Sequence, residues 1–115
     1  MRNTRHARGL ALADKQLLME LKEIILRFVP DAELFVYGSA ARGQRGPESD
    51  YDVLILLNTS LSSEGQDAIG CAIYELELAR GIVISEVFLS REEWAHGIIA
   101  ASPFRQSVGK EAIRI

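Results

Sequence analysis

The sequence contains a single cysteine, Cys71, among its 115 residues. One cysteine excludes an intrachain disulfide and a zinc site built from several thiolates. Such scarcity is typical of proteins that work in a reduced intracellular setting. Cys71 falls within a helical pattern, so we expect it to pack as a small apolar side chain rather than act as a nucleophile.

The chain also lacks an excess of basic charge and a long apolar run. Its 13 Lys and Arg residues stand against 16 Asp and Glu residues, which gives a net charge of -3. This balance argues against a protein that coats nucleic acid, and no direct nucleic-acid partner is expected. No apolar segment near the start is long enough for a signal peptide or a membrane span, so we expect a cytoplasmic protein.

The length of the chain suits one domain. Residues 1–13 carry Arg2, Arg5 and Arg8 and are predicted to form a flexible basic arm. Residues 14–115 are predicted to form a single domain, because a chain that is 48% hydrophobic can bury a core of its own.

Helical and strand patterns alternate along this domain. The first half is predicted to contain a helix at 14–29 capped by Asp14, a strand at 33–38, a helical turn at 40–43 and a strand at 51–57. A helix follows that opens with a Ser63–Gln66 capping box and ends at Gly81, and it leads into a strand at 81–89. The last predicted helix opens with a Ser90–Glu93 capping box and ends at Pro103, and the final four residues of the tail are predicted to form an edge strand. Strands separated by helices predict an α/β (α+β) domain with a small mixed sheet flanked by helices.

Two carboxylates stand where the central strand is predicted to begin. Side chains at alternate positions of a strand point to the same face, so Asp50 and Asp52 are expected to project together. Tyr51 between them must face the other side, where we expect it in the core. Like charges at close range raise each other's pKa unless a cation compensates. Paired carboxylates therefore favour a hard ion such as Mg²⁺, which also binds substrate phosphates.

A Gly-Ser turn precedes these aspartates. Gly38 and Ser39 follow a predicted strand and lead into a short helical turn, which directs backbone N–H groups and a hydroxyl outward. Gly38 allows a phosphate to approach the backbone closely. Arg42 lies about one turn further on, from where its guanidinium can reach a terminal phosphate.

Glu86 is the remaining candidate. It is the only acid in the strand at 81–89, and a lone charge in an apolar run is costly unless it is paired or bound to a metal. This favours a role as a third metal ligand or as a general base. The alternative is that Glu86 lies at an exposed end of the strand or pairs with an arginine.

These segments together resemble a known family. Gly38-Ser39, Ala41-Arg42-Gly43 and Ser49-Asp50-Tyr51-Asp52-Val53 are similar to the GS–x10–DxD signature of the DNA polymerase β-like nucleotidyltransferase superfamily. The short length and the closing SREEW and SPF segments resemble its minimal nucleotidyltransferase (MNT) branch, which includes antitoxins paired with HEPN-domain toxins.

The resemblance implies a fold and a set of roles. The fold would be the palm-like sheet of polymerase β, with Gly38 and Ser39 on the nucleotide phosphates. Asp50 and Asp52 would bind Mg²⁺, and a third carboxylate from the next strand, here Glu86, would complete the catalytic site. In the antitoxin members, AMP from ATP is transferred to a tyrosine of the HEPN toxin.

Three functions follow from this reading. The first is an Mg²⁺-dependent nucleotidyltransferase that uses ATP and modifies a protein hydroxyl, namely a tyrosine of a HEPN toxin. The second is a binding antitoxin that occludes its partner without catalysis. The third is transfer to a small molecule, for which the chain lacks the usual helical substrate domain. An exposed sheet edge, expected in so small a domain, is compatible with a partner or a self-dimer.

Overall fold

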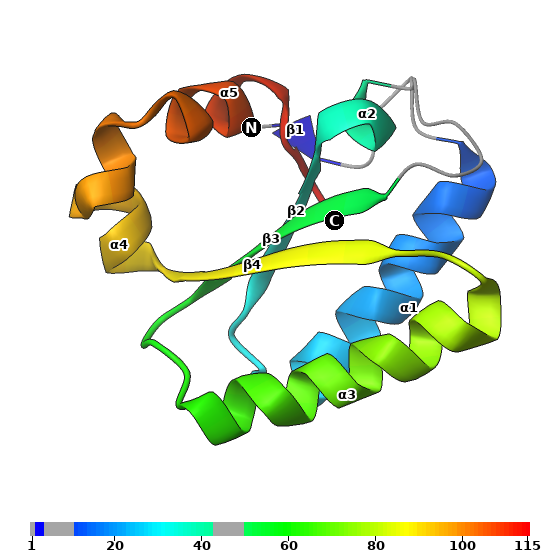
Figure 1. The fold of residues 1–115 in the computed structure, drawn as a ribbon. Coiled ribbons are helices and arrows are strands. Elements are labelled where there is room, and N and C mark those ends of the chain that lie inside the picture. The colour runs from blue at the N-terminus through cyan, green and yellow to red at the C-terminus, as the bar shows by residue number, and fades with distance from the viewer. Residues whose placement is uncertain (1, 4–10, 43–49) are drawn as a thin grey trace.

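A five-stranded sheet forms the centre of the molecule in the computed structural model, which describes residues 2–3, 11–42 and 50–115 (Figure 1). The strands are β1 (Arg2–Asn3), β2 (Glu33–Tyr37), β3 (Tyr51–Leu57), β4 (Ile84–Ser90) and β5 (Ile113–Arg114). Their order is β1-β5-β2-β3-β4. The β2–β3 and β2–β5 pairs are antiparallel, whereas β3–β4 and β1–β5 are parallel, which confirms the predicted mixed sheet.

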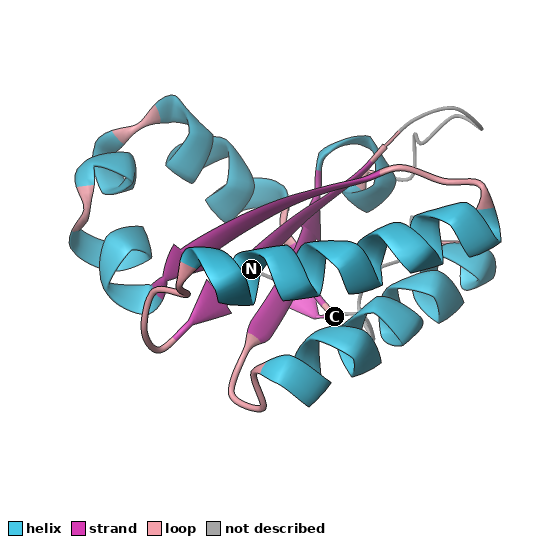
Figure 2. Ribbon diagram, turned by 60° about the horizontal axis from the view of Figure 1, so that its bottom comes forward, coloured by secondary structure: helices cyan, strands magenta, loops and turns pink. Residues whose placement is uncertain are grey.

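Helices cover both faces of the sheet. They are α1 (Leu12–Phe28), α2 (Gly38–Ala41), α3 (Ser63–Arg80), α4 (Arg91–His96), a 3-10 turn at Ile98–Ala101 and α5 (Pro103–Glu111). Figure 2 shows α1 and α3 side by side along one face, with the shorter C-terminal helices on the other side of the sheet. No helix of the described residues has the length and apolar character needed to cross a membrane.

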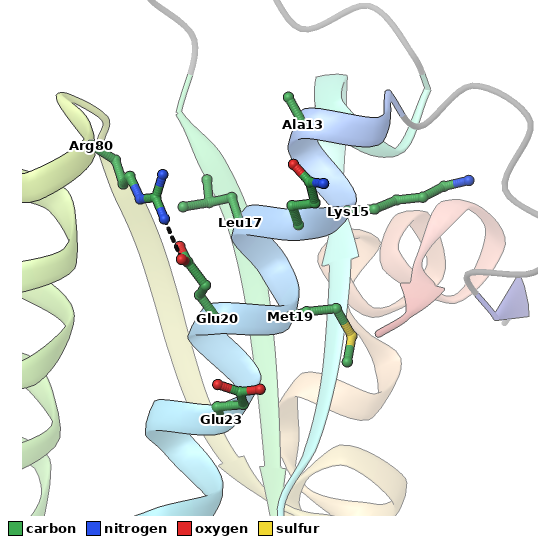
Figure 3. A pocket seen from close by; sticks show the side chains of 8 residues that line it. Ala13, Lys15, Leu17, Met19, Glu20, Glu23 and Arg80 are labelled. Carbon is green, nitrogen blue, oxygen red and sulfur yellow. Dashed lines mark hydrogen bonds and ion pairs between the residues drawn. The ribbon is translucent and has the colours of Figure 1, made fainter.

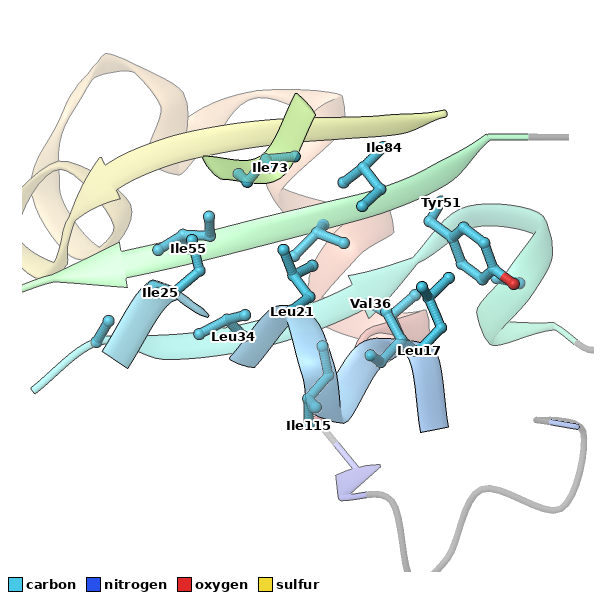
Figure 4. Packing of buried hydrophobic residues seen from close by; sticks show 14 of the residues in the cluster. Leu17, Leu21, Ile25, Leu34, Val36, Tyr51, Ile55, Ile73, Ile84 and Ile115 are labelled. Atoms are coloured by element: carbon cyan, nitrogen blue, oxygen red, sulfur yellow. The ribbon is translucent and has the colours of Figure 1, made fainter. Parts of the chain in front are cut away.

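The larger core lies between the sheet and the pair α1 and α3. Leu21 and Ile25 of α1 meet Val53 and Ile55 of β3 and Ile73 of α3, and all five side chains are at most 1% exposed (Figure 4). Tyr51 belongs to this core, as predicted, and its hydroxyl donates a hydrogen bond to the Asp14 carboxylate. This contact fixes the start of β3 against the first turn of α1.

The smaller core lies on the opposite face. Leu54 and Leu56 of β3 pack there with Trp94 of α4 and Val108 of α5. The guanidinium of Arg105 lies 4.0 Å from the centre of the Trp94 ring. Successive residues of β3 therefore alternate between two cores, which explains why the strand is apolar at both parities.

Several helix ends differ from the sequence prediction. The first helix begins at Leu12, so Asp14 lies in its first turn rather than at its cap. The cap of α3 is Ser62, whose hydroxyl accepts from the Gly65 N–H, and not Ser63. Pro103 begins α5 rather than ending the previous helix, because its missing N–H suits a first helical position. The capping box at Ser90 is confirmed.

Two further predictions need correction or restriction. Arg2 and Asn3, inside the predicted basic arm, pair with β5 at the edge of the sheet. Cys71 lies on the solvent side of α3 and is exposed, so it is not a core residue. The loop predicted between the Gly-Ser turn and β3 falls outside the described residues.

Candidate active site

The start of β3 carries the paired carboxylates. Asp50 directly precedes the strand and is exposed, and Asp52 is its second residue and is partly buried. Because Tyr51 faces the α1–α3 core, Asp50 and Asp52 project to the opposite face. The structure thus brings the two aspartates together as the sequence predicts.

The neighbouring strand contributes a serine to this face. The parallel register pairs Asp52 with Ser85, and the Ser85 hydroxyl donates to Asp50 Oδ2 at 3.2 Å. This hydroxyl holds one of the two carboxylates in place. Ser85 thus occupies the position on β4 from which a third carboxylate could share a metal with Asp50 and Asp52.

The Gly-Ser turn lies against the same carboxylates. β2 ends at Tyr37, which is paired with Asp52, and Gly38 then begins α2 with φ of 72°. A Cβ at Gly38 would come closer than 3.0 Å to Asp52 Oδ2 and to 3.3 Å from Asp52 Cγ. Only glycine fits here, because the conformation disfavours other residues and the carboxylate fills the space of a side chain. Ser39 follows within α2 and is partly buried.

Arg42 and a residue not predicted from the sequence complete the group. Arg42 follows α2, and its Nη1 donates to Glu111 Oε2 at 2.7 Å. The other oxygen of Glu111 accepts from the Gly38 N–H at 3.2 Å. Glu111 is the last residue of α5, which contacts α2 in the fold. The carboxylate thereby bridges the two donors that we assigned to phosphate.

The described residues of the site carry an excess of negative charge. Burial raises the pKa of the Asp52 carboxyl, and the nearby Asp50 and Glu111 carboxylates raise it further, whereas Arg42 lowers it. The pKa of Tyr37 is raised by burial and by Asp52. Tyr37 also packs edge-on against Phe104, with ring centres 5.7 Å apart. A cation placed at Asp50 and Asp52 would relieve this repulsion.

Glu86 does not belong to this group, which corrects the sequence prediction. It is paired with Val53 and therefore shares the α1–α3 face of the sheet. There it lines a groove beside α3 with residues such as Asp67, Tyr74 and Glu75. Burial raises the pKa of Glu86, and Glu77 raises it further. A carboxylate on this face cannot share a metal with Asp50 and Asp52 on the other.

Two carboxylates suit a single Mg²⁺ ion that takes its remaining ligands from water and phosphate. Among the described residues, no group of three or more His, Cys, Asp and Glu side chains is arranged to hold a metal. The two carboxylates at Asp50 and Asp52 are oxygen donors of the kind that a hard divalent cation binds.

A second groove, along α1, lacks these features. It is lined by residues of α1 and by Arg80 of α3, which pairs with Glu20 (Figure 3). Its carboxylates, Glu20 and Glu23, lie on one helix, and the described residues that line the groove include no glycine. The Gly-Ser turn and the paired aspartates predicted from the sequence lie instead at the β2–α2 turn and the start of β3.

Comparison with known proteins identifies a related family. A family model described as a nucleotidyltransferase domain matches residues 18–111. No curated protein is significantly similar to the chain in sequence.

The fold is similar to solved toxin–antitoxin structures. A mutant of the toxin–antitoxin MntA-HpeT has a TM-score of 0.58 at 16% identity, over 85% of this chain and 70% of the other. A toxin–antitoxin crystallised with AMP-PNP has a TM-score of 0.57 at 16% identity, over 88% and 71%.

A third structure is described as a tri-AMPylated Shewanella oneidensis HEPN toxin in complex with an MNT antitoxin. It has a TM-score of 0.55 at 14% identity, over 87% and 69% of the two chains. At these identities the likeness concerns the fold, whereas the family model spans most of the sequence. The chain therefore belongs to the nucleotidyltransferase domain family.

Proposed function

We propose that this chain transfers AMP from ATP to a protein hydroxyl, and that it acts as the antitoxin of a HEPN-domain toxin. The observation that carries the proposal is the approach of the Gly38 turn to the Asp52 carboxylate, on the face that also holds Asp50. This arrangement places anion donors beside paired carboxylates, as transfer from a nucleoside triphosphate requires. The solved relatives with AMP-PNP and with an AMPylated toxin support the choice of nucleotide and acceptor.

The residues have separate roles in this proposal. The Gly38 N–H, the Ser39 hydroxyl and Arg42 bind the β- and γ-phosphates and orient the α-phosphorus. Asp50, oriented by Ser85, and Asp52 would hold Mg²⁺, which would neutralise charge on the phosphates.

The reaction exchanges one phosphoester bond for another. The acceptor oxygen attacks the α-phosphorus, and the bond to the oxygen that bridges to the β-phosphate breaks. Pyrophosphate leaves on the donors of the turn, and the acceptor proton passes to solvent. Glu86 has no part in this sequence because it lies on the other face of the sheet.

The test uses mass measurement of both chains. The protein is incubated with Mg²⁺, α-labelled ATP and the HEPN-domain product of a neighbouring gene. We expect the partner to gain the mass of one or more AMP groups, and Asp50→Asn to prevent the gain. A partner that is silenced in a stable complex without any gain in mass would replace this proposal by occlusion. Transfer to a small molecule with an unmodified partner would contradict both.

A further inference from the structure

The Glu111 carboxylate occupies the donors that the proposed function assigns to phosphate. One oxygen lies 3.2 Å from the Gly38 nitrogen and the other lies 2.7 Å from Arg42 Nη1. Two oxygens of one anion thus bind a turn N–H and a guanidinium together, as two oxygens of a phosphate would. The same carboxylate is close enough to Asp52 for their charges to interact.

We propose that Glu111 is an internal competitor that holds the phosphate donors of the Gly38 turn until a nucleotide displaces it. This inference rests on the proposed function, because it takes the turn as the phosphate site. Glu111, at the end of α5 and far from the turn in sequence, would then partly set the affinity of the site for the triphosphate.

The fold keeps this competitor in place. Glu111 directly precedes Ala112, which is fully buried, and β5, which pairs with β2 just before the turn. The backbone that carries Glu111 is therefore fixed beside the donors. A nucleotide can therefore displace the Glu111 carboxylate by rotation of the side chain alone, while the backbone stays in place.

The strength of the contact suits a competitor rather than a permanent structural bond. The side chains of Arg42 and Glu111 are 47% and 25% exposed, and ion pairs at such exposure contribute little to stability. A triphosphate brings more charge and more acceptor oxygens to the same donors, so it displaces the carboxylate. When pyrophosphate leaves, Glu111 recovers the donors and favours release.

The geometry does not indicate that Glu111 is a third metal ligand beside Asp50 and Asp52. In the part of the chain that the structure describes, Asp50, Asp52 and Glu111 do not form a metal-holding group. Glu111 faces the cationic donors of the turn, and its negative charge opposes that of Asp52. Its removal should therefore improve phosphate binding, whereas removal of a metal ligand would weaken it.

The experiment compares Glu111→Gln with Glu20→Gln. Both changes remove one negative charge and one exposed ion pair, but Glu20 pairs with Arg80 on the α1–α3 side, away from the turn. Dissociation constants are measured by calorimetry for inorganic tripolyphosphate and for ATP with Mg²⁺. We expect Glu111→Gln to lower both constants about three- to tenfold, the range for losing a weak competing ion pair. Glu20→Gln should bind as the wild type does.

The outcomes separate this inference from the proposed function. If the wild type binds both ligands and Glu111→Gln binds them equally or more weakly, Glu111 is not a competitor and the proposed function is unaffected. If tripolyphosphate binds more tightly to Glu111→Gln but no variant binds ATP, the competitor stands and the nucleotide assignment fails. If neither ligand binds to any variant, both proposals fail. An equal gain in Glu20→Gln would assign the effect to net charge alone and overturn the inference.

Discussion

Asp52 and Glu86 lie on adjacent strands, one step apart in register, and point to opposite faces of the sheet. Burial raises the pKa of each, so a perturbed carboxyl is common to both faces. What surrounds the two groups is different. Asp52 has a second aspartate, an arginine and a glycine turn beside it, whereas Glu86 lines a groove with further acids and an exposed tyrosine. A perturbed pKa marks a candidate, and the neighbours decide its chemistry.

The largest expected difference between the faces concerns transfer itself. Under the proposed function, Asp52→Asn should lower the rate of AMP incorporation about 100-fold or more, because charge stabilisation worth several kcal/mol would be lost with the proposed Mg²⁺ ion. Glu86→Gln should stay within about twofold of the wild type, as for substitutions outside the site. The measurement is the single-turnover rate with the proposed HEPN-domain partner. A comparable loss in Glu86→Gln would return that residue to the site.

The two glycines with positive φ offer a second comparison. Gly38 has φ of 72° and Gly81, at the end of α3, has φ of 65°. A Cβ at Gly81 meets nothing within 4 Å, whereas one at Gly38 meets the Asp52 carboxylate. Gly81→Ala should cost about 1 kcal/mol of unfolding free energy for its conformation alone. Gly38→Ala should cost about 2–4 kcal/mol because overpacking is added.

Urea unfolding of both glycine variants measures this difference. Nucleotide binding should persist in Gly81→Ala and be lost in Gly38→Ala, since the carboxylate must move to admit the methyl group. If the two variants were equally destabilised, the closeness of Gly38 to Asp52 would add no strain to the Gly38→Ala substitution.

A third prediction concerns a carboxylate added to the face that holds Asp50 and Asp52. Ser85→Asp places an acid beside Asp50 and Asp52, where β4 carries only a hydroxyl. We expect the affinity for Mg²⁺ to rise about three- to tenfold, because an added carboxylate strengthens an oxygen site for a hard cation. Ser85→Asn has nearly the same size without the charge and should not show the gain. Calorimetric titration with Mg²⁺ tests it, and unchanged affinity in Ser85→Asp would contradict this geometry.

The sequence predicts the orientation of the β3 side chains better than that of the β4 side chains, because the two strands differ in their residue patterns. β3 begins and ends where expected, and the two-residue period correctly placed Asp50 and Asp52 together and Tyr51 in the core. β4 carries apolar residues on both of its faces, so its pattern does not show which face Glu86 takes. Only the register with β3 does, and register depends on tertiary pairing.

Glu111 could not be predicted for a related reason. It ends a mostly polar helix in the tail, about seventy residues from the turn that it contacts, and a lone acid there is usually solvated. Ser62 illustrates a smaller limit. Two adjacent serines could each cap α3, and the structure selects the first.

The smallest predicted effect concerns the pH dependence of stability at Glu86. Its pKa is raised in the fold, so folding favours the neutral carboxyl over the charged one. The contribution of Glu86 to stability is therefore fully present below the ordinary glutamate pKa and is lost as the pH rises through the raised value. At pH 7 the charged side chain costs stability that a neutral amide would not.

Glu86→Gln should thus be more stable than the wild type at pH 7 by a few tenths of a kcal/mol, roughly the scale of a partly solvated charge. The difference should shrink as the pH falls toward about 4, where the glutamate becomes neutral in both states. Urea unfolding at several pH values measures it. A stability difference that grows on acidification would mean that a cation pairs with Glu86 in the folded protein, and the two faces would then differ less than their surroundings indicate.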